Sequence, residues 1–530
     1  MRIPATDHEL NTLDNLEFQN PHFIMETLSS NISLALLILI LVYIWSTSTT
    51  IMSGNSVHVC VSSRKLNNLY CISAGTKPGF HFPLLPNTSI GTIHNGNSVI
   101  IDTRSIDVAP LAIESTTIGT LLPIVGTGTK RDEDHHRDFV VDEDVIEQHL
   151  RLHRSWSSEH TGSTSSCTGR RVYVYDLPTK FNKDLLIGRC GDKCFDNGGL
   201  GKPIEKLDKG WYDTHHYFLE PIFHSRVLNH QCRVHNEDEA MLFYVPYYGG
   251  LWHLKNVSRD TLDLDLIKWL ESKKSWSHNF GKDHVFVLGL GTTRFLHLAQ
   301  MKNPTKLLIE REPWDVNQIG IPSPTYFHPH SDDDILSLQL QAMRSPRRSL
   351  VSLIGSTWSN QSSDSNNIIS MLIKQCVGLP TELCKFLDCG SGECNRPELV
   401  IELFMESEFC LHPPGDRFTR KWLFDSLVSG CIPVLFSPFT AYYQYPWHLP
   451  EEDEKYSVFL DQEEVMQQRV NVVERVMRTS SRHREDMRRF IVYELLPGLV
   501  YGDSSSQLVK FRDSFSITLD NLIKWVNRLE

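Results

Sequence analysis

The sequence has no excess of basic residues and no closely paired cysteines of the kind that bind zinc. Its 52 Lys and Arg residues against 64 Asp and Glu residues give a net charge of −12 at pH 7, which argues against a protein that coats nucleic acid by bulk charge. Twelve cysteines in 530 residues are too few for a disulfide-dense scaffold. Since none of them forms a C-x-x-C pair, disulfides are favoured over a metal site. The hydrophobic share of 40% is globular, and the length leaves room for two domains.

Charged residues are absent between Ile32 and Met52. A helix over this run would be about 31 Å long, close to the ~30 Å hydrocarbon thickness of a bilayer. A cleaved signal peptide and a buried core helix are the alternatives. The signal peptide is disfavoured because a long acidic segment precedes the run and no A-x-A-like cleavage site follows it. We predict a transmembrane anchor at residues 32–52, preceded by a cytosolic tail at residues 1–31.

The segment after the anchor, residues 53–169, is predicted to be a stem. It is rich in Ser, Thr, Gly and Asn, contains an acidic run at 131–147, and shows no sustained helical or strand period. All twelve cysteines lie beyond the anchor, which suits an oxidising compartment. Three N-x-S/T sequons also follow the anchor, and we predict glycosylation at Asn87, Asn256 and Asn360.

From residue 170 onward, short β-branched and aromatic runs alternate with helical patterns, which predicts an α/β fold with parallel sheets. Two such series are separated by a Pro-rich segment at 321–334, so we expect two Rossmann-like domains facing a cleft, at 170–335 and 336–530. The amphipathic end, 463–530, would finish the second domain or pack back across the first. The expected strands are 171–178, 240–248, 284–291, 306–310, 349–355, 408–416 and 431–436; the expected helices include 217–228, 261–271 and 396–407.

One unit, residues 408–436, carries most of the chemical information. Its first strand ends in a tight Pro-Pro-Gly-Asp turn, Thr419 or Asp416 can cap the helix that follows, and Gly430 can end that helix in a left-handed conformation. A helix N-terminus with nearby basic residues at the carboxyl edge of a sheet is suited to a diphosphate, whereas an ordinary βαβ unit with a solvated basic turn is the alternative. Asp425 could accept hydrogen bonds from ribose hydroxyls. The predicted donor-binding set is Gly415, Asp416, Arg417, Thr419, Arg420 and Asp425.

Several separated motifs resemble the exostosin-type glycosyltransferases of family 47, and within them the plant xyloglucan galactosyltransferases. The motifs are GLG at 199–201, WYDTHHYFLEPIFHSR at 211–226, FYVPYYGG at 243–250, PTYFHP at 324–329 and TAYYQYPWHLP at 440–450, together with the 408–436 unit. The resemblance covers roughly residues 170–525 and implies a GT-B fold on a type II Golgi membrane anchor, with the catalytic part in the lumen. It also implies a UDP-sugar donor held by the C-terminal domain and an inverting transfer of galactose onto xylose side chains of xyloglucan.

Two segments depart from the family pattern, residues 289–294 and the pair His215-His216. They leave open the transfer of another UDP-sugar (galacturonic acid, arabinose or xylose), or a non-catalytic lumenal partner of other glycosyltransferases. An inverting transferase needs a base, and the candidates are Glu310, at the end of an expected strand, and His215.

No divalent metal and no permanently bound cofactor is expected. The D-x-D pair Asp263 and Asp265 alternates with leucines at the head of an expected helix, where capping and surface charge are favoured over metal binding.

Overall fold

The computed structural model describes residues 56–62, 69–75, 137–141, 143–154, 167–186, 197–254, 259–289, 293–296, 298–356, 367–415 and 417–529. The predicted anchor at 32–52, the sequons at Asn87, Asn256 and Asn360, and Asp416 all lie outside these residues. Within the described ranges, no helix combines the length and the apolar composition needed to cross a membrane.

The first half of the molecule is built on a six-stranded sheet with the order β11-β10-β9-β8-β4-β7, in which all neighbouring strands are parallel. Its central strands are buried along their whole length, as expected of a parallel sheet with helices on both faces. The strands are β4 (Val172–Val174), β7 (Arg233–Val234), β8 (Leu242–Val245), β9 (His284–Leu288), β10 (Thr305–Leu308) and β11 (Gln318–Gly320). The helices between them include α5 (Leu219–Leu228), α6 (Arg259–Glu271) and α7 (Lys274–His278).

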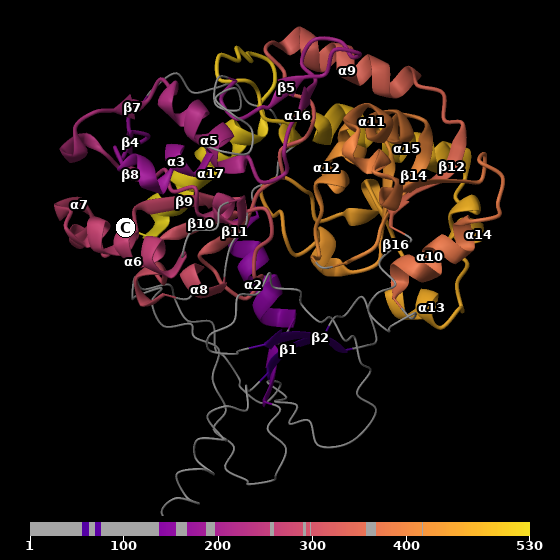
Figure 1. The fold of residues 1–530 in the computed structure, drawn as a ribbon, viewed down its shortest axis with the longest axis horizontal. Helices are drawn as coiled ribbons and strands as arrows, with labels where there is room; N and C mark the ends of the chain where they lie inside the picture. Colours follow the sequence, from indigo (N-terminus) through magenta and orange to yellow (C-terminus); the bar gives the residue numbers. More distant parts are fainter. Residues whose placement is uncertain are drawn as a thin grey trace, which may run out of the picture.

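The second half contains a five-stranded parallel sheet with the order β13-β12-β14-β15-β16. The two halves lie side by side in Figure 1, the first in magenta and the second in orange. The strands are β12 (Ser349–Gly355), β13 (Cys384–Asp388), β14 (Ser407–His412), β15 (Ile432–Leu435) and β16 (Val458–Phe459). The helices include α9 (Asp332–Arg344), α10 (Ile368–Cys376), α11 (Pro397–Met405) and α12 (Lys421–Val428). The predicted α/β fold with parallel sheets is confirmed, although four short strands, β7, β11, β13 and β16, were not expected.

The C-terminal helix α17 (Ser514–Leu529) returns to the first half of the molecule. Its apolar face, which includes Leu519, Leu522 and Trp525, belongs to the hydrophobic core built around the first sheet. Figure 1 shows this yellow helix among the magenta elements. Of the two placements left open for the C-terminal segment, packing across the first half is therefore the one that α17 adopts.

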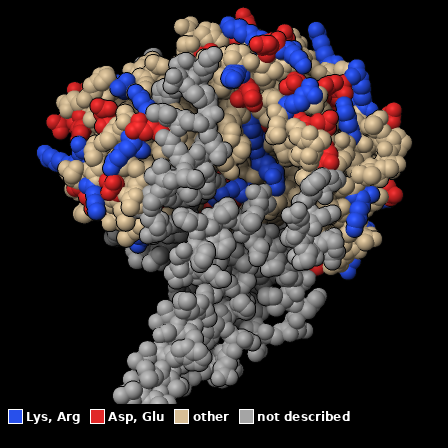
Figure 2. Space-filling view, viewed as in Figure 1, with Lys and Arg blue, Asp and Glu red and all other residues tan. Residues whose placement is uncertain are grey.

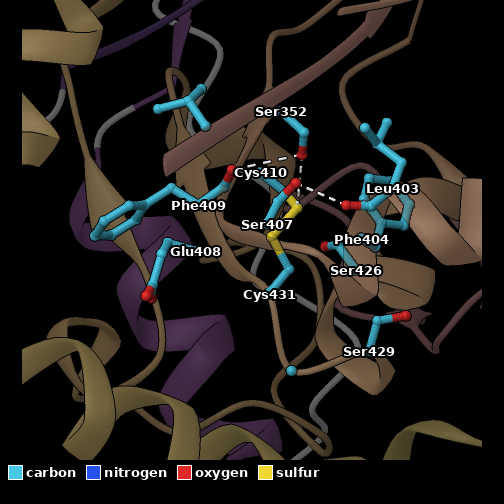
Figure 3. The surroundings of a disulfide bond; sticks show 12 residues. Ser352, Leu403, Phe404, Ser407, Glu408, Phe409, Cys410, Ser426, Ser429 and Cys431 are labelled. Carbon is cyan, nitrogen blue, oxygen red and sulfur yellow. Dashed lines mark hydrogen bonds between the residues drawn. A yellow bond between two sulfur atoms is a disulfide. The ribbon is translucent and has the colours of Figure 1, made fainter. Parts of the chain in front are cut away.

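Four disulfides are present among the described residues: Cys167–Cys232, Cys376–Cys384, Cys389–Cys394 and Cys410–Cys431. The expectation that cysteines form disulfides is confirmed for these eight. Figure 3 shows the Cys410–Cys431 bond, buried beside Ser352 and Ser407. It joins β14 to the residue before β15, so the strand–loop–helix–strand unit that the sequence singled out is closed by a covalent bond. Closing a loop of this length typically stabilises a fold by about 3 kcal/mol.

No helix or strand was predicted in the stem segment, residues 53–169, yet four elements lie in its described parts. β1 (Ser56–Ser62), β2 (Leu69–Gly75) and β3 (Arg137–Val141) form a three-stranded sheet, and α2 (Glu143–His153) follows it. Helix α2 was missed because its acidic first turn resembles the end of the preceding acidic run. In general, acidic residues in the first turn of a helix are favourable because of the helix dipole. Ile146 and Leu150 recur at helical spacing and are buried.

Candidate functional site

The loop between β14 and α12 was expected to bind an anionic ligand, and its local geometry is now defined. Helix α12 begins at Lys421, with Arg420 in an extended conformation as the N-cap residue and no side-chain capping bond there. The expectation that Thr419 caps the helix is therefore wrong, because the chain enters the helix one residue later. Gly430 ends the helix region in the left-handed conformation, with φ of 69°, as predicted.

Gly415 lies in close contact with the side chain of Arg420. A Cβ atom at position 415 would overlap the Arg420 guanidinium, so this side chain lies directly against the Gly415 backbone. The Gly415 N–H in turn donates to Arg417 O at 3.1 Å, which closes the turn. The structure thus brings Gly415, Arg417 and Arg420 together in one turn at the carboxyl end of β14.

Glu310, expected at the cleft as a base, reaches this loop from the first half. It follows β10, and its Oε2 accepts a hydrogen bond of 3.1 Å from the Thr419 N–H. The Arg417 Nη1 lies 3.7 Å from Glu310 Oε1, and the Glu310 side chain keeps 19% of its surface exposed. A solvent-accessible carboxylate from one sheet therefore contacts a basic loop of the other.

His215 and His216 precede α5, are both exposed, and stack on each other with ring centroids 4.4 Å apart. The surrounding protein, followed by the charges of His215, Lys421, Arg417 and Arg420, lowers the pKa of His216 to about 3. Figure 2 shows Lys and Arg side chains in the hollow between the two halves. Because the charges of Lys421, Arg417 and Arg420 act on His216, the histidine pair lies close to the basic loop.

Asp425 has partners inside the protein. Its side chain is 2% exposed, Lys421 Nζ lies 2.7 Å from Oδ2 and 2.9 Å from Oδ1, and the Tyr326 N–H donates to Oδ1 at 3.1 Å. Burial lowers the pKa of Lys421 to about 8. Both oxygens of Asp425 are thus engaged, and a ribose hydroxyl would have to share or replace one of these contacts. The pair also ties the Pro-rich segment to α12.

Glu220, on the first turn of α5, was not among the residues predicted from the sequence. Its side chain is fully buried, its Oε1 accepts from the Gly250 N–H at 3.0 Å, and burial raises its pKa to about 8. A Cβ at Gly289 would lie 2.8 Å from Glu220 Oε2, so the chain after β9 requires glycine there. The sequence did carry a signal for its burial, because this acidic residue lies between Leu219 and Ile222 in an otherwise apolar motif. Glu220 joins the ends of β8 and β9 at the edge that faces the site.

The D-x-D pair does not converge on a common point. Asp263 is buried and accepts a hydrogen bond from the Tyr247 hydroxyl, whereas Asp265 is exposed and pairs with Lys180 Nζ at 2.8 Å. In the part of the chain that the structure describes, no group of three or more His, Cys, Asp or Glu residues could hold a metal ion. Asp265 carries the surface charge that the sequence pattern favoured, whereas Asp263 is buried in a hydrogen bond that was not predicted.

Comparison with known proteins places these motifs in context. Residues 166–476 match the profile of the Exostosin GT47 domain. The chain is 46% identical to "Probable xyloglucan galactosyltransferase GT20" from Arabidopsis thaliana over 91% of each chain. It is 43% identical to "Xyloglucan-specific galacturonosyltransferase 1" from the same plant, covering 93% of this chain and 88% of the relative. It is also 34% identical to "Xyloglucan galactosyltransferase MUR3", again from Arabidopsis thaliana, covering 68% and 63% respectively.

The buried acid Glu220 predicts a pH dependence of stability. Its pKa rises from 4.5 to about 8 on folding, so the stability that the protonated form contributes is complete below pH 4.5 and is lost as the pH rises to about 8. Glu220→Gln keeps the acceptor for Gly250 and removes the titration. We expect the free energy of unfolding, measured with denaturant from pH 5 to 8, to fall less in this variant than in the parent. Exposed Glu382→Gln is the control; an unchanged slope in Glu220→Gln would contradict the assignment.

Proposed function

From the premise that the chain belongs to the exostosin GT47 family of glycosyltransferases, we propose that it transfers galactose from UDP-galactose onto the xylosyl side chains of xyloglucan, with inversion at the sugar carbon. The observation that carries the proposal is the contact of Glu310 with the loop before α12. It sets a candidate base beside a candidate diphosphate site, the two functions that an inverting transferase has to combine.

In the proposed reaction, Glu310 accepts the proton of an acceptor hydroxyl as its oxygen attacks C1 of the sugar. The bond between C1 and the diphosphate oxygen breaks, and the electron pair leaves with UDP. Arg420 and the free N–H groups of the first turn of α12 stabilise the charge that develops on the diphosphate. Thr419 N and Arg417 contact Glu310, so the proposed base and the proposed diphosphate site share one loop.

The proposed donor-binding set remains Gly415, Asp416, Arg417, Thr419, Arg420 and, for the ribose, Asp425. It belongs to a GT-B arrangement in which the second half binds the nucleotide. His215 stands as a contact to the acceptor, since it is exposed and stacks on His216, whose pKa responds to the charges of the basic loop. Anchorage at 32–52 would place the site in the Golgi lumen, where the four disulfides are chemically stable.

UDP-galacturonic acid is the second candidate donor. The observation that favours it is the relative at 43% identity that is named as a galacturonosyltransferase. A uronic acid carries a carboxylate, for which Arg417 and Arg420 are suitable partners. Incubation of the purified enzyme with each UDP-sugar and xyloglucan oligosaccharides, followed by mass analysis of the product, separates the two. Transfer from neither donor would favour the non-catalytic alternative.

Arg420→Ala is expected to weaken UDP binding by roughly 10- to 150-fold, because a charge-assisted hydrogen bond to phosphate is worth ~1.5–3 kcal/mol. Calorimetric titration with UDP measures the change. Arg344→Ala, an exposed position in the last turn of α9, is the control and should bind UDP as the parent does. A folded Arg420→Ala protein with unchanged affinity would remove Arg420 from the site.

Glu310→Gln is expected to lower kcat by about 10²- to 10⁴-fold, because the amide cannot take the proton of the acceptor hydroxyl. Steady-state kinetics with the active donor measure the effect, and thermal unfolding checks that the fold is kept. Asp265→Asn removes a more exposed carboxylate, on α6, that pairs with Lys180, and should leave kcat unchanged. A Glu310→Gln enzyme of near-parental kcat would show that the base lies elsewhere.

Transfer is expected to proceed without a divalent metal, because Arg417, Arg420 and the N-terminus of α12 supply the positive charge for the diphosphate. Activity in excess chelator should remain within about twofold of the untreated value. If chelation abolished transfer, manganese restored it, and Asp263→Asn with Asp265→Asn also abolished it, the donor-site assignment would be wrong.

A further inference from the structure

Helix α2 lies before the region that matches the family profile, yet it packs against the first half of the molecule beside the site. The His153 Nε2 lies 2.7 Å from Val316 O, and the His149 Nδ1 lies 3.3 Å from Pro313 O. Burial lowers the pKa of both imidazoles, that of His153 to about 3, so the neutral rings donate an N–H to these carbonyls. Helix α2 therefore holds the segment that begins three residues after Glu310.

The same helix packs against the second half. Ile146 and Leu150 form a small core with Phe439 and Tyr443, and Phe418 packs against this core from the donor loop. The Phe418 and Phe439 ring centroids are 5.1 Å apart. Phe418 stands between Arg417 and Thr419, the two residues that contact Glu310. The apolar face of α2 is thus one layer of side chains behind the contact between base and loop.

An ion pair reinforces this position. Arg154, just after α2, lies 2.8 Å from Glu451 of the second half. Figure 1 shows α2 in purple between the two halves, with the β1–β2 strands below it. A helix bonded to both halves behind their shared site restricts how they can shift relative to each other.

We propose that α2 is a positioning element of the donor site, which holds the 415–420 loop and the 310–316 segment in register through Ile146 and Leu150. This inference rests on the proposed function of the loop. The catalytic unit would then begin before residue 166, where the family domain starts. Residues of the predicted stem would contribute to the geometry of the site.

The test compares leucine-to-alanine variants of the full chain in detergent. Leu150 is 1% exposed and faces the small core, Leu152 on the same helix is 43% exposed, and Leu270 on α6 is fully buried in the first core. Two readouts are taken for each: the Kd for UDP by calorimetry, and amide hydrogen exchange of the peptide spanning residues 410–424. Leu270→Ala controls for loss of stability, and Leu152→Ala controls for a change in helix α2 itself.

Leu150→Ala is expected to weaken UDP binding by about fivefold and to speed exchange in the 410–424 peptide, since packing changes along such a contact typically alter coupling on this scale. Leu152→Ala should change neither readout, and Leu270→Ala should lower the melting temperature without changing either. If Leu150→Ala fails to fold, Leu150→Val serves, with smaller changes in the same direction.

A folded Leu150 variant with parental UDP affinity and parental exchange would overturn the inference, as would the same local exchange change in Leu270→Ala. If the parent protein itself bound no UDP, the donor-site proposal would fail. The exchange readout would still decide whether α2 orders the loop.

Discussion

The buried guanidinium of Arg311 is the contact on which the geometry of the site depends. Its Nε donates to Tyr443 O at 2.8 Å, its Nη1 donates to Gln318 O at 3.1 Å, and its main-chain N–H donates to the Gln444 side chain at 2.8 Å. Burial lowers its pKa to about 9, so it remains charged near neutral pH. A buried charge is tolerated only where carbonyls receive its N–H groups. These carbonyls come from both halves, which sets their spacing.

Glu310 precedes Arg311, and its position follows from that contact. With Arg311 held between the halves, the neighbouring carboxylate reaches the Thr419 N–H of the opposite half. Gly320 contributes to the same close approach, because a side chain there would overlap the Gln444 backbone. The two sheets therefore meet through backbone and buried polar groups rather than through a flexible linker alone. This boundary fixes the position of Glu310 relative to the loop before α12.

Charge is distributed unevenly over this molecule. The chain as a whole carries −12, yet Arg417, Arg420 and the buried Lys421 lie close enough to His216 that their charges add to the effect of burial in lowering its pKa. The internal pair of Lys421 with Asp425 compensates one of these cations, and Glu310 lies beside another. The remaining positive field suits a diphosphate, whose charge in a concave site is screened less by solvent than on an open surface.

The repeated β and α units, the turn after β14 and the left-handed Gly430 could be predicted because they depend on side chains only a few residues apart. The family resemblance could also be recognised from the sequence, because each of its motifs is a short continuous segment. Helix α2 and Glu220 could not be assigned in this way. Helix α2 begins at the edge of an acidic run, which obscures its start. A glutamate on a helix is usually exposed to solvent, and only the structure shows that Glu220 is buried.

What the sequence by itself determined about this protein is the local architecture: the parallel α/β units, a loop with the donors for an anion, and the family that these motifs identify. Only the tertiary structure decided which distant residues meet. Glu310 and Thr419 are 109 residues apart, and His153 and Val316 are 163 apart. Such contacts depend on how two cores and a returning C-terminal helix pack, and no periodicity or turn chemistry along the chain encodes that packing directly. For the same reason the sequence did not reveal that Asp425 is buried and paired with Lys421. It also did not reveal that Arg420, rather than Thr419, is the N-cap residue of α12.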